Sequence, residues 1–187
     1  MKLVDQLVKA AENPMSPRSR FVSRLLPVFV FFWFFPALLF IIPSFVLDPW
    51  LHLPTFLTLI TRAILGGFLI APGIFFLVSS TKAQRVIGKG TPIPLRATKK
   101  LVIEKPYLYC RNPLYFGLIS FFLGISITIG SISSLVMVTI FSSIILFYIK
   151  LIEEQELEKR YGDDYLAYKV STPMLIPRLP FLRRNRK

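Results

Sequence analysis

The sequence is poor in the side chains used for metal and thiol chemistry. Its 187 residues include one cysteine, Cys110, and one histidine, His52. A single cysteine excludes a disulfide within the chain, and these two residues alone cannot form a Cys/His zinc site. His52 is far from other polar clusters, and we interpret it as structural. We predict no metal site, so any chemistry has to use carboxylates, arginine, lysine and tyrosine.

Acidic residues are also scarce. Ten Asp and Glu face 23 Lys and Arg, giving a net charge of +13. In a soluble protein this excess would suggest nucleic acid, but 53% of the residues are hydrophobic and the mean hydropathy is +0.59. Basic side chains also collect at the cytoplasmic ends of membrane helices. We therefore predict an all-α integral membrane protein whose partner is the lipid bilayer and not nucleic acid.

Two apolar runs in the first half predict two membrane spans. Residues 25–47 carry no charge over 23 positions, enough for one span. Prolines 27, 36 and 43 predict kinks in that helix. Residues 48–54 form a predicted loop, and residues 55–80 are the second span. Arg62 lies near its outer end, where we favour snorkelling to the interface over a place in a polar cavity.

The second half contains a longer uncharged stretch. No charged residue occurs in the 38 positions between Arg111 and Lys150. This stretch is too long for one helix across a bilayer, and the sequence GSISS at 130–134 predicts a turn near its middle. We expect two antiparallel helices of about 16 or 17 residues. Gly117, Ser120 and Gly124 predict a seam of close helix packing.

The positions of the basic residues predict the topology. Five precede the first span, eight lie in residues 81–111 and nine follow from Lys150, which leaves only Arg62 elsewhere. Four spans with both termini in the cytoplasm, in a prokaryotic plasma membrane, are expected. We predict a single membrane domain, 1–187. Its parts are an N-terminal segment (1–24), spans 1 and 2 (25–80), a long loop (81–113), the hairpin of spans 3 and 4 (114–152), and a cytoplasmic helix with a basic tail (153–187).

A helical hairpin returns to the surface that it left. Arg111 should therefore lie beside Glu153 and Glu154, although they are about 40 residues away in sequence. After the hairpin, the helix should continue at least to Tyr161, with Glu156 and Arg160 as a surface pair.

Two further patterns concern the same end of the hairpin. The apolar face of that helix includes Glu153, so we expect Glu153 to point inward and Glu154 and Glu158 to be more exposed. Glu153 then either pairs with Arg111 or binds a ligand. All seven tyrosines are predicted at this face, which indicates a stacking and hydrogen-bonding pocket or an interfacial belt: Tyr107, Tyr109, Tyr115, Tyr148, Tyr161, Tyr165 and Tyr168.

Several sequence blocks follow one another in the order typical of a known family. They are GKGTPIP at 88–94, LVIEKPY at 101–107, RNPLYFG at 111–117, the pair Glu153 and Glu154, and YGDDYLAYKVSTPMLIPR at 161–178. Together these blocks, which cover the C-terminal half, resemble the isoprenylcysteine carboxyl methyltransferases and their phospholipid N-methyltransferase relatives.

The resemblance implies a membrane enzyme that binds S-adenosylmethionine at the cytoplasmic face and takes a lipophilic acceptor from the bilayer. By motif position, it places the cofactor contacts at Lys100, Leu101, Val102, Tyr107, Asn112, Pro113, Leu114, Tyr115 and Glu153. Arg111 and Glu154 are accessory candidates, and no catalytic residue is assigned.

Two departures from the family pattern bear on the acceptor. Better-known members have histidine where Asn112 stands, and prenylcysteine methyltransferases have an arginine where this chain has Ile149. A prenylcysteine-like carboxylate, a neutral lipid, an amine and a thiol therefore all stay open as acceptors.

Two other functions fit the same residues. Sterol reductases resemble the C-terminal pattern too, and Lys99 and Lys100 suit the phosphate of NADPH. A membrane scaffold or lipid-binding protein without catalysis would use the tyrosines and arginines as anchors only.

Overall fold

The computed structural model describes residues 29–87 and 101–178, and every regular element within these ranges is helical, as predicted. The described residues form two compact units. Residues 73–87, 101–118 and 147–178 contain all seven tyrosines and are called the tyrosine unit here. Residues 29–72 and 119–146 are called the apolar unit. Pro27, the GKGTPIP block, Lys99 and Lys100 lie outside the described ranges.

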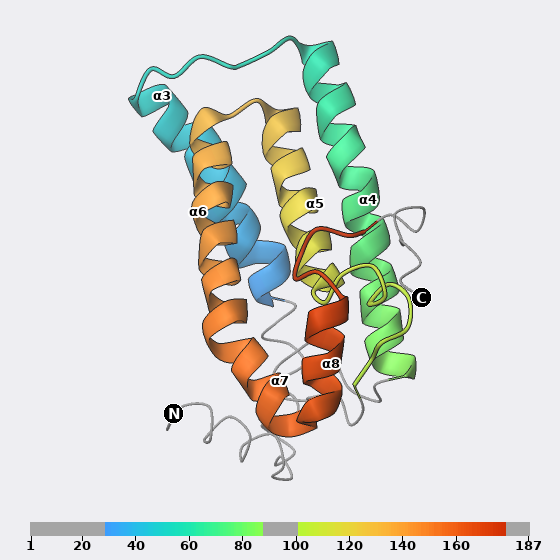
Figure 1. Ribbon diagram of the computed structural model, residues 1–187. Helices are drawn as coiled ribbons and strands as arrows, with labels where there is room; N and C mark the ends of the chain where they lie inside the picture. The colour runs from blue at the N-terminus through green and yellow to red at the C-terminus, as the bar shows by residue number, and fades with distance from the viewer. Residues whose placement is uncertain (1–28, 88–100, 179–187) are drawn as a thin grey trace. The chain divides into compact units, whose positions relative to one another are not determined.

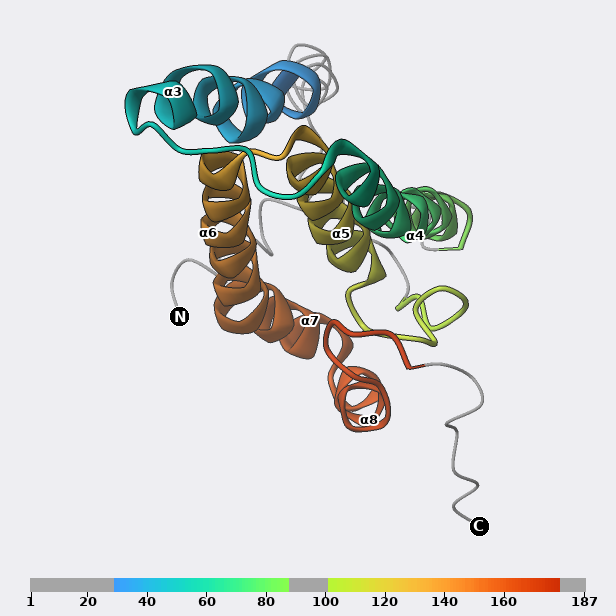
Figure 2. The same cartoon turned by 90° about the horizontal axis from the view of Figure 1, so that it is seen from above.

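The first apolar run folds into wide helical turns. Three π-helical segments, η1 (Val30–Phe34), η2 (Ala37–Ile41) and η3 (Pro43–Leu47), lead into the short helix α3 (Asp48–Trp50), and they form one continuous rod (Figure 2). The N–H that ends each π segment bonds to a carbonyl five residues back. Pro36 and Pro43 lie at the starts of η2 and η3 and have no N–H for an ordinary α-helical bond.

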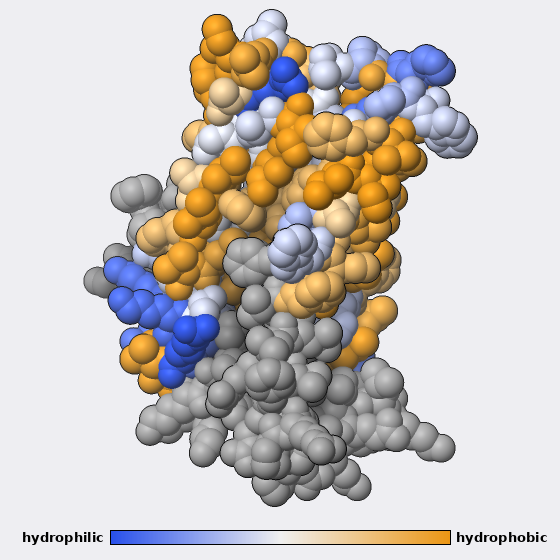
Figure 3. Space-filling view, turned by 180° about the vertical axis from the view of Figure 1, so that it is seen from behind, coloured by the Kyte–Doolittle hydropathy of each residue, from blue (hydrophilic) through white to orange (hydrophobic). Residues whose placement is uncertain are grey.

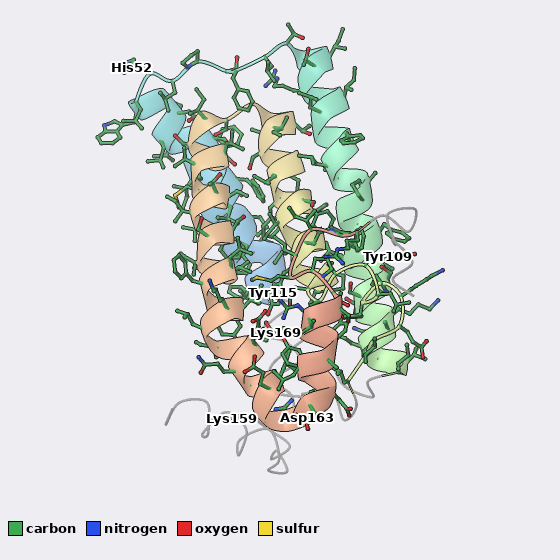
Figure 4. The ribbon with its side chains drawn as sticks, in the orientation of Figure 1. His52, Tyr109, Tyr115, Lys159, Asp163 and Lys169 are labelled. Atoms are coloured by element: carbon green, nitrogen blue, oxygen red, sulfur yellow. The ribbon has the colours of Figure 1, made fainter. Side chains whose placement is uncertain are left out.

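Helix α4 (Leu59–Val86) is displaced from the predicted span at both ends. The first three residues of the predicted loop, Asp48–Trp50, are helical, so the loop before α4 begins only at Leu51. This loop includes His52, which is exposed (Figure 4). At its other end α4 continues six residues past Ser80 into the predicted loop. The residues after Ser80 include lysine, glutamine and arginine, which are good helix formers. The apolar run therefore ends at Ser80, but the helix continues.

The hairpin has the predicted form. Helices α5 (Pro113–Ile129) and α6 (Ile132–Tyr148) have 17 residues each. Between them Gly130 adopts a φ of +78°, a conformation that favours glycine. Arg62 donates a hydrogen bond from Nη1 to the carbonyl of Ile129 at 2.6 Å, so it caps the C-terminus of α5. This contact differs from the snorkelling that we had favoured.

The predicted glycine seam packs α5 directly against α4. In the apolar unit, a Cβ on Gly124 would lie 2.8 Å from the carbonyl oxygen of Gly66. In the tyrosine unit, a Cβ on Gly117 would lie 2.9 Å from the carbonyl oxygen of Gly73. The contacting glycines are seven residues apart on each helix, 66 and 73 on α4 and 117 and 124 on α5, so they repeat on one face every two turns.

The outward sides of the helices are apolar. Leu59–Val86 and Ile132–Tyr161 are long and apolar enough to cross a membrane, and Ala37–Trp50 and Pro113–Ile129 are shorter apolar helices. Only 17% of each long apolar window is buried, whereas the core helix of a soluble protein would be mostly buried. Figure 3 shows this broad hydrophobic surface in orange.

The chain after the hairpin makes one more π turn. The segment η5 (Ile149–Glu153) follows α6 directly, and the N–H of Glu154 bonds to the carbonyl of Ile149. Helix α7 (Glu154–Tyr161) then ends at Gly162, and α8 (Asp163–Ser171) runs back along it (Figure 1). The predicted exposure of Glu154 is wrong, since this residue is only 6% exposed. A π turn holds more residues than an α turn, so it rotates the residues that follow away from their α-helical positions.

The glycine contacts predict a position-specific loss of stability. Gly66→Ala would place its Cβ 2.7 Å from the carbonyl oxygen of Gly124 and closer still to Thr128, and we expect a cost of about 1–3 kcal/mol in unfolding free energy. In Gly67→Ala the new Cβ meets no described atom within 4 Å, so helix propensity alone should make this control neutral or stabilising by about 1 kcal/mol. Thermal unfolding in detergent measures both. Equal effects of the two variants would contradict the contact.

Candidate functional site

Three buried tyrosines form the centre of the tyrosine unit. Tyr107, Tyr165 and Tyr168 cluster with Ala83 of α4 and with Val102. Val102 lies in residues 101–112, the described part of the connection between α4 and α5, which is called the loop here. The hydroxyl of Tyr168 donates to the backbone carbonyl of Tyr107 at 2.6 Å. Helix α8 is therefore joined to the loop through aromatic packing and through a buried hydrogen bond.

The segment before α5 is bonded to the segment after α8. The backbone N–H groups of Arg111 and Asn112 donate to the carbonyls of Pro173 and Met174 at 2.8 and 3.1 Å. The N–H of Arg178 donates to the carbonyl of Tyr109 at 2.9 Å. Two sequence blocks about 60 residues apart thus form one structure.

A chain of ion pairs links the segment before α5 to α7 and α8. Arg111 contacts Glu154 at 2.8 Å, and both side chains are less than 10% exposed. Lys169 of α8 contacts Glu154 at 2.9 Å and Glu158 at 2.5 Å (Figure 4). The prediction that Arg111 would meet the glutamate pair is confirmed, and its partner is Glu154. The predicted contact of Glu156 with Arg160 is also confirmed, at 2.5 Å, but its predicted place on the surface is wrong, since Glu156 is only 8% exposed.

Glu153 has a different environment. Its carboxylate forms a hydrogen bond with the hydroxyl of Tyr115, from the first turn of α5. Tyr107 and Tyr148 are near enough to interact with it electrostatically. The second carboxylate oxygen, Oε2, is buried and has no hydrogen-bond partner among the described residues. Glu153 therefore has one oxygen committed to the fold and one that is not.

Gln84 adds a polar group from α4. Its Nε2 donates to the hydroxyl of Tyr107 at 2.6 Å, while its Oε1 is buried without a hydrogen-bond partner in the described part of the chain. Glu153, Tyr115, Tyr107 and Gln84 thus form a polar cluster inside an aromatic surrounding, which we call the candidate site.

Burial keeps the nearby hydroxyl and thiol groups neutral. It raises the pKa of Tyr107 and Tyr168, and it raises the pKa of Cys110 to about 12. Burial, with the charge of Glu154, also raises the pKa of Tyr165 to about 12. At neutral pH these groups act as hydrogen-bonding groups, not as bases or nucleophiles.

Comparison with known proteins identifies the family. Residues 61–164, more than half of the chain, match the phospholipid methyltransferase family model. The chain belongs to this family. A search of curated proteins found no match.

The match to the phospholipid methyltransferase family runs from the first turn of α4 into α8 and includes the whole candidate site. It confirms the resemblance read from the sequence, and it makes the chain a member of a methyltransferase family with apolar helices suited to a membrane.

The structure brings together only part of the cofactor set that was predicted by motif position. Tyr107, Tyr115 and Glu153 lie in the candidate site. Val102 is buried in the tyrosine cluster, and Leu101 lines a groove of about 660 Å³ along α8. Lys100 lies outside the described residues.

The other predicted contacts lie where α5 begins. Asn112 is buried, and its Nδ2 donates to the carbonyl of Met174 at 3.0 Å. Pro113 is fully buried at the first position of α5, a favoured place for proline, and Leu114 is partly buried beside it. Asn112 therefore supports the segment after α8.

Sequence analysis missed the contribution of α4. Gln84 lies in the stretch that was predicted as a loop, so its alignment with Tyr107 was not foreseen. The available signal was the run of helix-forming residues after Ser80, which continues the helical spacing beyond the apolar segment.

The buried ion pair predicts a strong stability effect. Glu154→Leu would leave the Arg111 guanidinium buried opposite an apolar side chain, and we expect a loss of about 3–5 kcal/mol in unfolding free energy. The double variant Arg111→Met/Glu154→Leu should recover most of that loss. Glu158→Gln is the control, since its pair with Lys169 is about one-third exposed and should contribute less than about 1 kcal/mol. Unfolding curves in which Glu154→Leu and Glu158→Gln coincide would rule out this role.

Cys110 offers a chemical probe of the same unit. It is fully buried and has a raised pKa, so maleimide should label it at least about 1000-fold more slowly at pH 7.5 in the folded protein than after SDS denaturation. The control is Cys110→Ser/Val170→Cys, because Val170 is 90% exposed and its replacement should react at once. Rapid labelling of native Cys110 would show that the contact between residues 109–112 and the segment after α8 opens readily.

Proposed function

We propose that this protein transfers a methyl group from S-adenosylmethionine to a lipophilic acceptor that reaches it from the bilayer. Membership of the phospholipid methyltransferase family supports the reaction class. The observation that carries the proposal is Glu153, whose buried Oε2 has no partner among the described residues although Tyr115 fixes the rest of the carboxylate. A buried carboxylate oxygen without a partner is costly unless a ligand supplies the missing hydrogen bond.

The residues of the site suit this methyl donor. S-adenosylmethionine has an ammonium and ribose hydroxyls, and Glu153 can accept a hydrogen bond from either. Its sulfonium and adenine suit the faces of aromatic side chains such as Tyr107 and Tyr115. When bound, it supplies an electrophilic methyl group on sulfur. The protein's contribution is to hold the two reactants in line, and orientation of this kind is a large source of rate acceleration.

The ion pairs bear on the acceptor. Glu154 occupies Arg111, and Glu154 and Glu158 together occupy Lys169. Ile149, which stands where prenylcysteine methyltransferases have an arginine, is fully buried. We therefore favour an acceptor without a carboxylate: a neutral lipid, a lipid amine or a thiol. We also propose that the site lies at the cytoplasmic surface, with four spans and both termini cytoplasmic.

A titration tests the donor. The purified full-length protein in detergent should bind S-adenosylmethionine saturably, and Glu153→Gln should weaken binding about 10- to 100-fold, since a neutral amide oxygen replaces the charged acceptor. Asp163→Asn, which changes an exposed carboxylate at the start of α8, is the matched control and should bind like the wild type.

One result would reject the proposed methyl donor, and another would reject a lipid as the acceptor. One is a wild-type protein that binds NADPH and ignores S-adenosylmethionine, which would favour the reductase. The other is labelled methyl donor that leaves no label in the lipid fraction of membranes containing the active protein, which would exclude a lipid acceptor.

A further inference from the structure

Three consecutive residues of α4, Ser79, Ser80 and Thr81, have side-chain hydroxyls that differ in their hydrogen bonding. Ser79 donates from Oγ to the carbonyl of Phe75 at 2.6 Å, and Thr81 donates from Oγ1 to the carbonyl of Leu77 at 2.8 Å. These are ordinary bonds back to the preceding helical turn. Ser80, between them, is fully buried, and its Oγ has no hydrogen-bond partner in the described ranges. Its hydroxyl is thus kept from water and has no hydrogen-bond partner among the described residues.

Gln84 lies one helical turn after Ser80, on the same face of α4. Its amide forms one hydrogen bond, with the hydroxyl of Tyr107, and leaves its other end buried and unpaired among the described residues. This conclusion survives exchange of the amide nitrogen and oxygen, which differ little in shape. In either orientation, the Gln84 amide and the Tyr107 hydroxyl together retain at least one hydrogen-bond donor and one acceptor for a third group.

These groups and Glu153 belong to one unit. Gln84 bonds to Tyr107, and Tyr107 interacts electrostatically with Glu153. Ser80, Gln84 and Glu153 each have a buried polar atom that lacks a partner in the described structure. Folded proteins leave few such atoms, because each costs a desolvation penalty. Two more such atoms in this unit, Nε of Arg111 and Oε1 of Glu154, belong to the buried ion pair. The three outside that pair indicate a polar ligand that completes their hydrogen bonds.

We propose that Ser80 and Gln84 are additional binding residues for the methyl donor, contributed by α4 to the polar amino-acid and ribose groups that Glu153 also contacts. This inference rests on the proposed function. Gln84 is also a positioning residue, since its hydrogen bond fixes the Tyr107 hydroxyl. The site then has three sides: the loop with the start of α5, the η5–α7 segment, and α4.

The adjacent serines provide a matched test. Ser80→Ala should raise the dissociation constant for S-adenosylmethionine about tenfold, whereas Ser79→Ala should leave it unchanged. Both variants remove one hydroxyl from neighbouring positions of the same helix. Without ligand, Ser80→Ala should melt no lower than the wild type, because the lost hydroxyl forms no hydrogen bond within residues 29–87 and 101–178. Gln84→Met should weaken binding by a similar factor while nearly preserving side-chain volume.

The outcomes separate the two proposals. If the wild type does not bind S-adenosylmethionine, the proposed function fails. If the wild type binds it and Ser80→Ala binds equally well, this inference alone is overturned. It is also overturned if donor affinity is unchanged and only the KM for the acceptor rises. Loss of binding in Ser80→Ala with a lowered melting temperature in the ligand-free state would assign Ser80 to the fold instead.

Discussion

The buried ion pair between Arg111 and Glu154 is the contact on which the tyrosine unit depends. A charge taken out of water is tolerated only where its partner and its remaining hydrogen-bonding groups are also in place. Arg111 precedes α5 and Glu154 begins α7, so the pair fixes the two ends of the hairpin segment inside this unit. Lys169 and Tyr165 add contacts to this pair from α8, so α8 must be folded back on α7 for these contacts to form, while Nε of Arg111 has no hydrogen-bond partner among the described residues.

Because of this pairing, the neighbouring residues Glu153 and Glu154 have different environments. Glu154 neutralises Arg111 and Lys169 and belongs to the fold. Glu153 forms a hydrogen bond with the Tyr115 hydroxyl, and its Oε2 is buried without a partner among the described residues. The π turn at Ile149–Glu153 makes this difference possible, because it sets the direction of both side chains at the junction between the hairpin and α7. Such turns are frequent at functional sites.

Sequence patterns predicted the parts of this fold that depend on composition and local conformation. The uncharged stretch and Gly130 predicted two helices of the observed length, and the seven tyrosines were correctly grouped. Charge patterning was less informative about helix ends, since α4 continues past the apolar run. Helical periodicity selected Glu153 but placed Glu154 on the surface, because it assumes a regular α-helix and cannot detect a π turn. The use of Arg62 as a helix cap required knowledge of which helix lies beside it.

The glycine contacts explain why α4 can contribute to the site. Gly73 meets Gly117 with their backbones in close approach, which fixes the level of α4 against α5 in the tyrosine unit. Ser80 lies seven residues beyond Gly73 and Gln84 eleven, so both recur on that face, roughly 10 and 16 Å further along at 1.5 Å per residue. Because α5 begins only four residues before Gly117, this part of α4 extends beyond the helix and faces the loop that contains Tyr107. The close packing of Gly73 against Gly117 thus fixes the position of α4, and two turns and more further along this helix its polar residues lie against the loop.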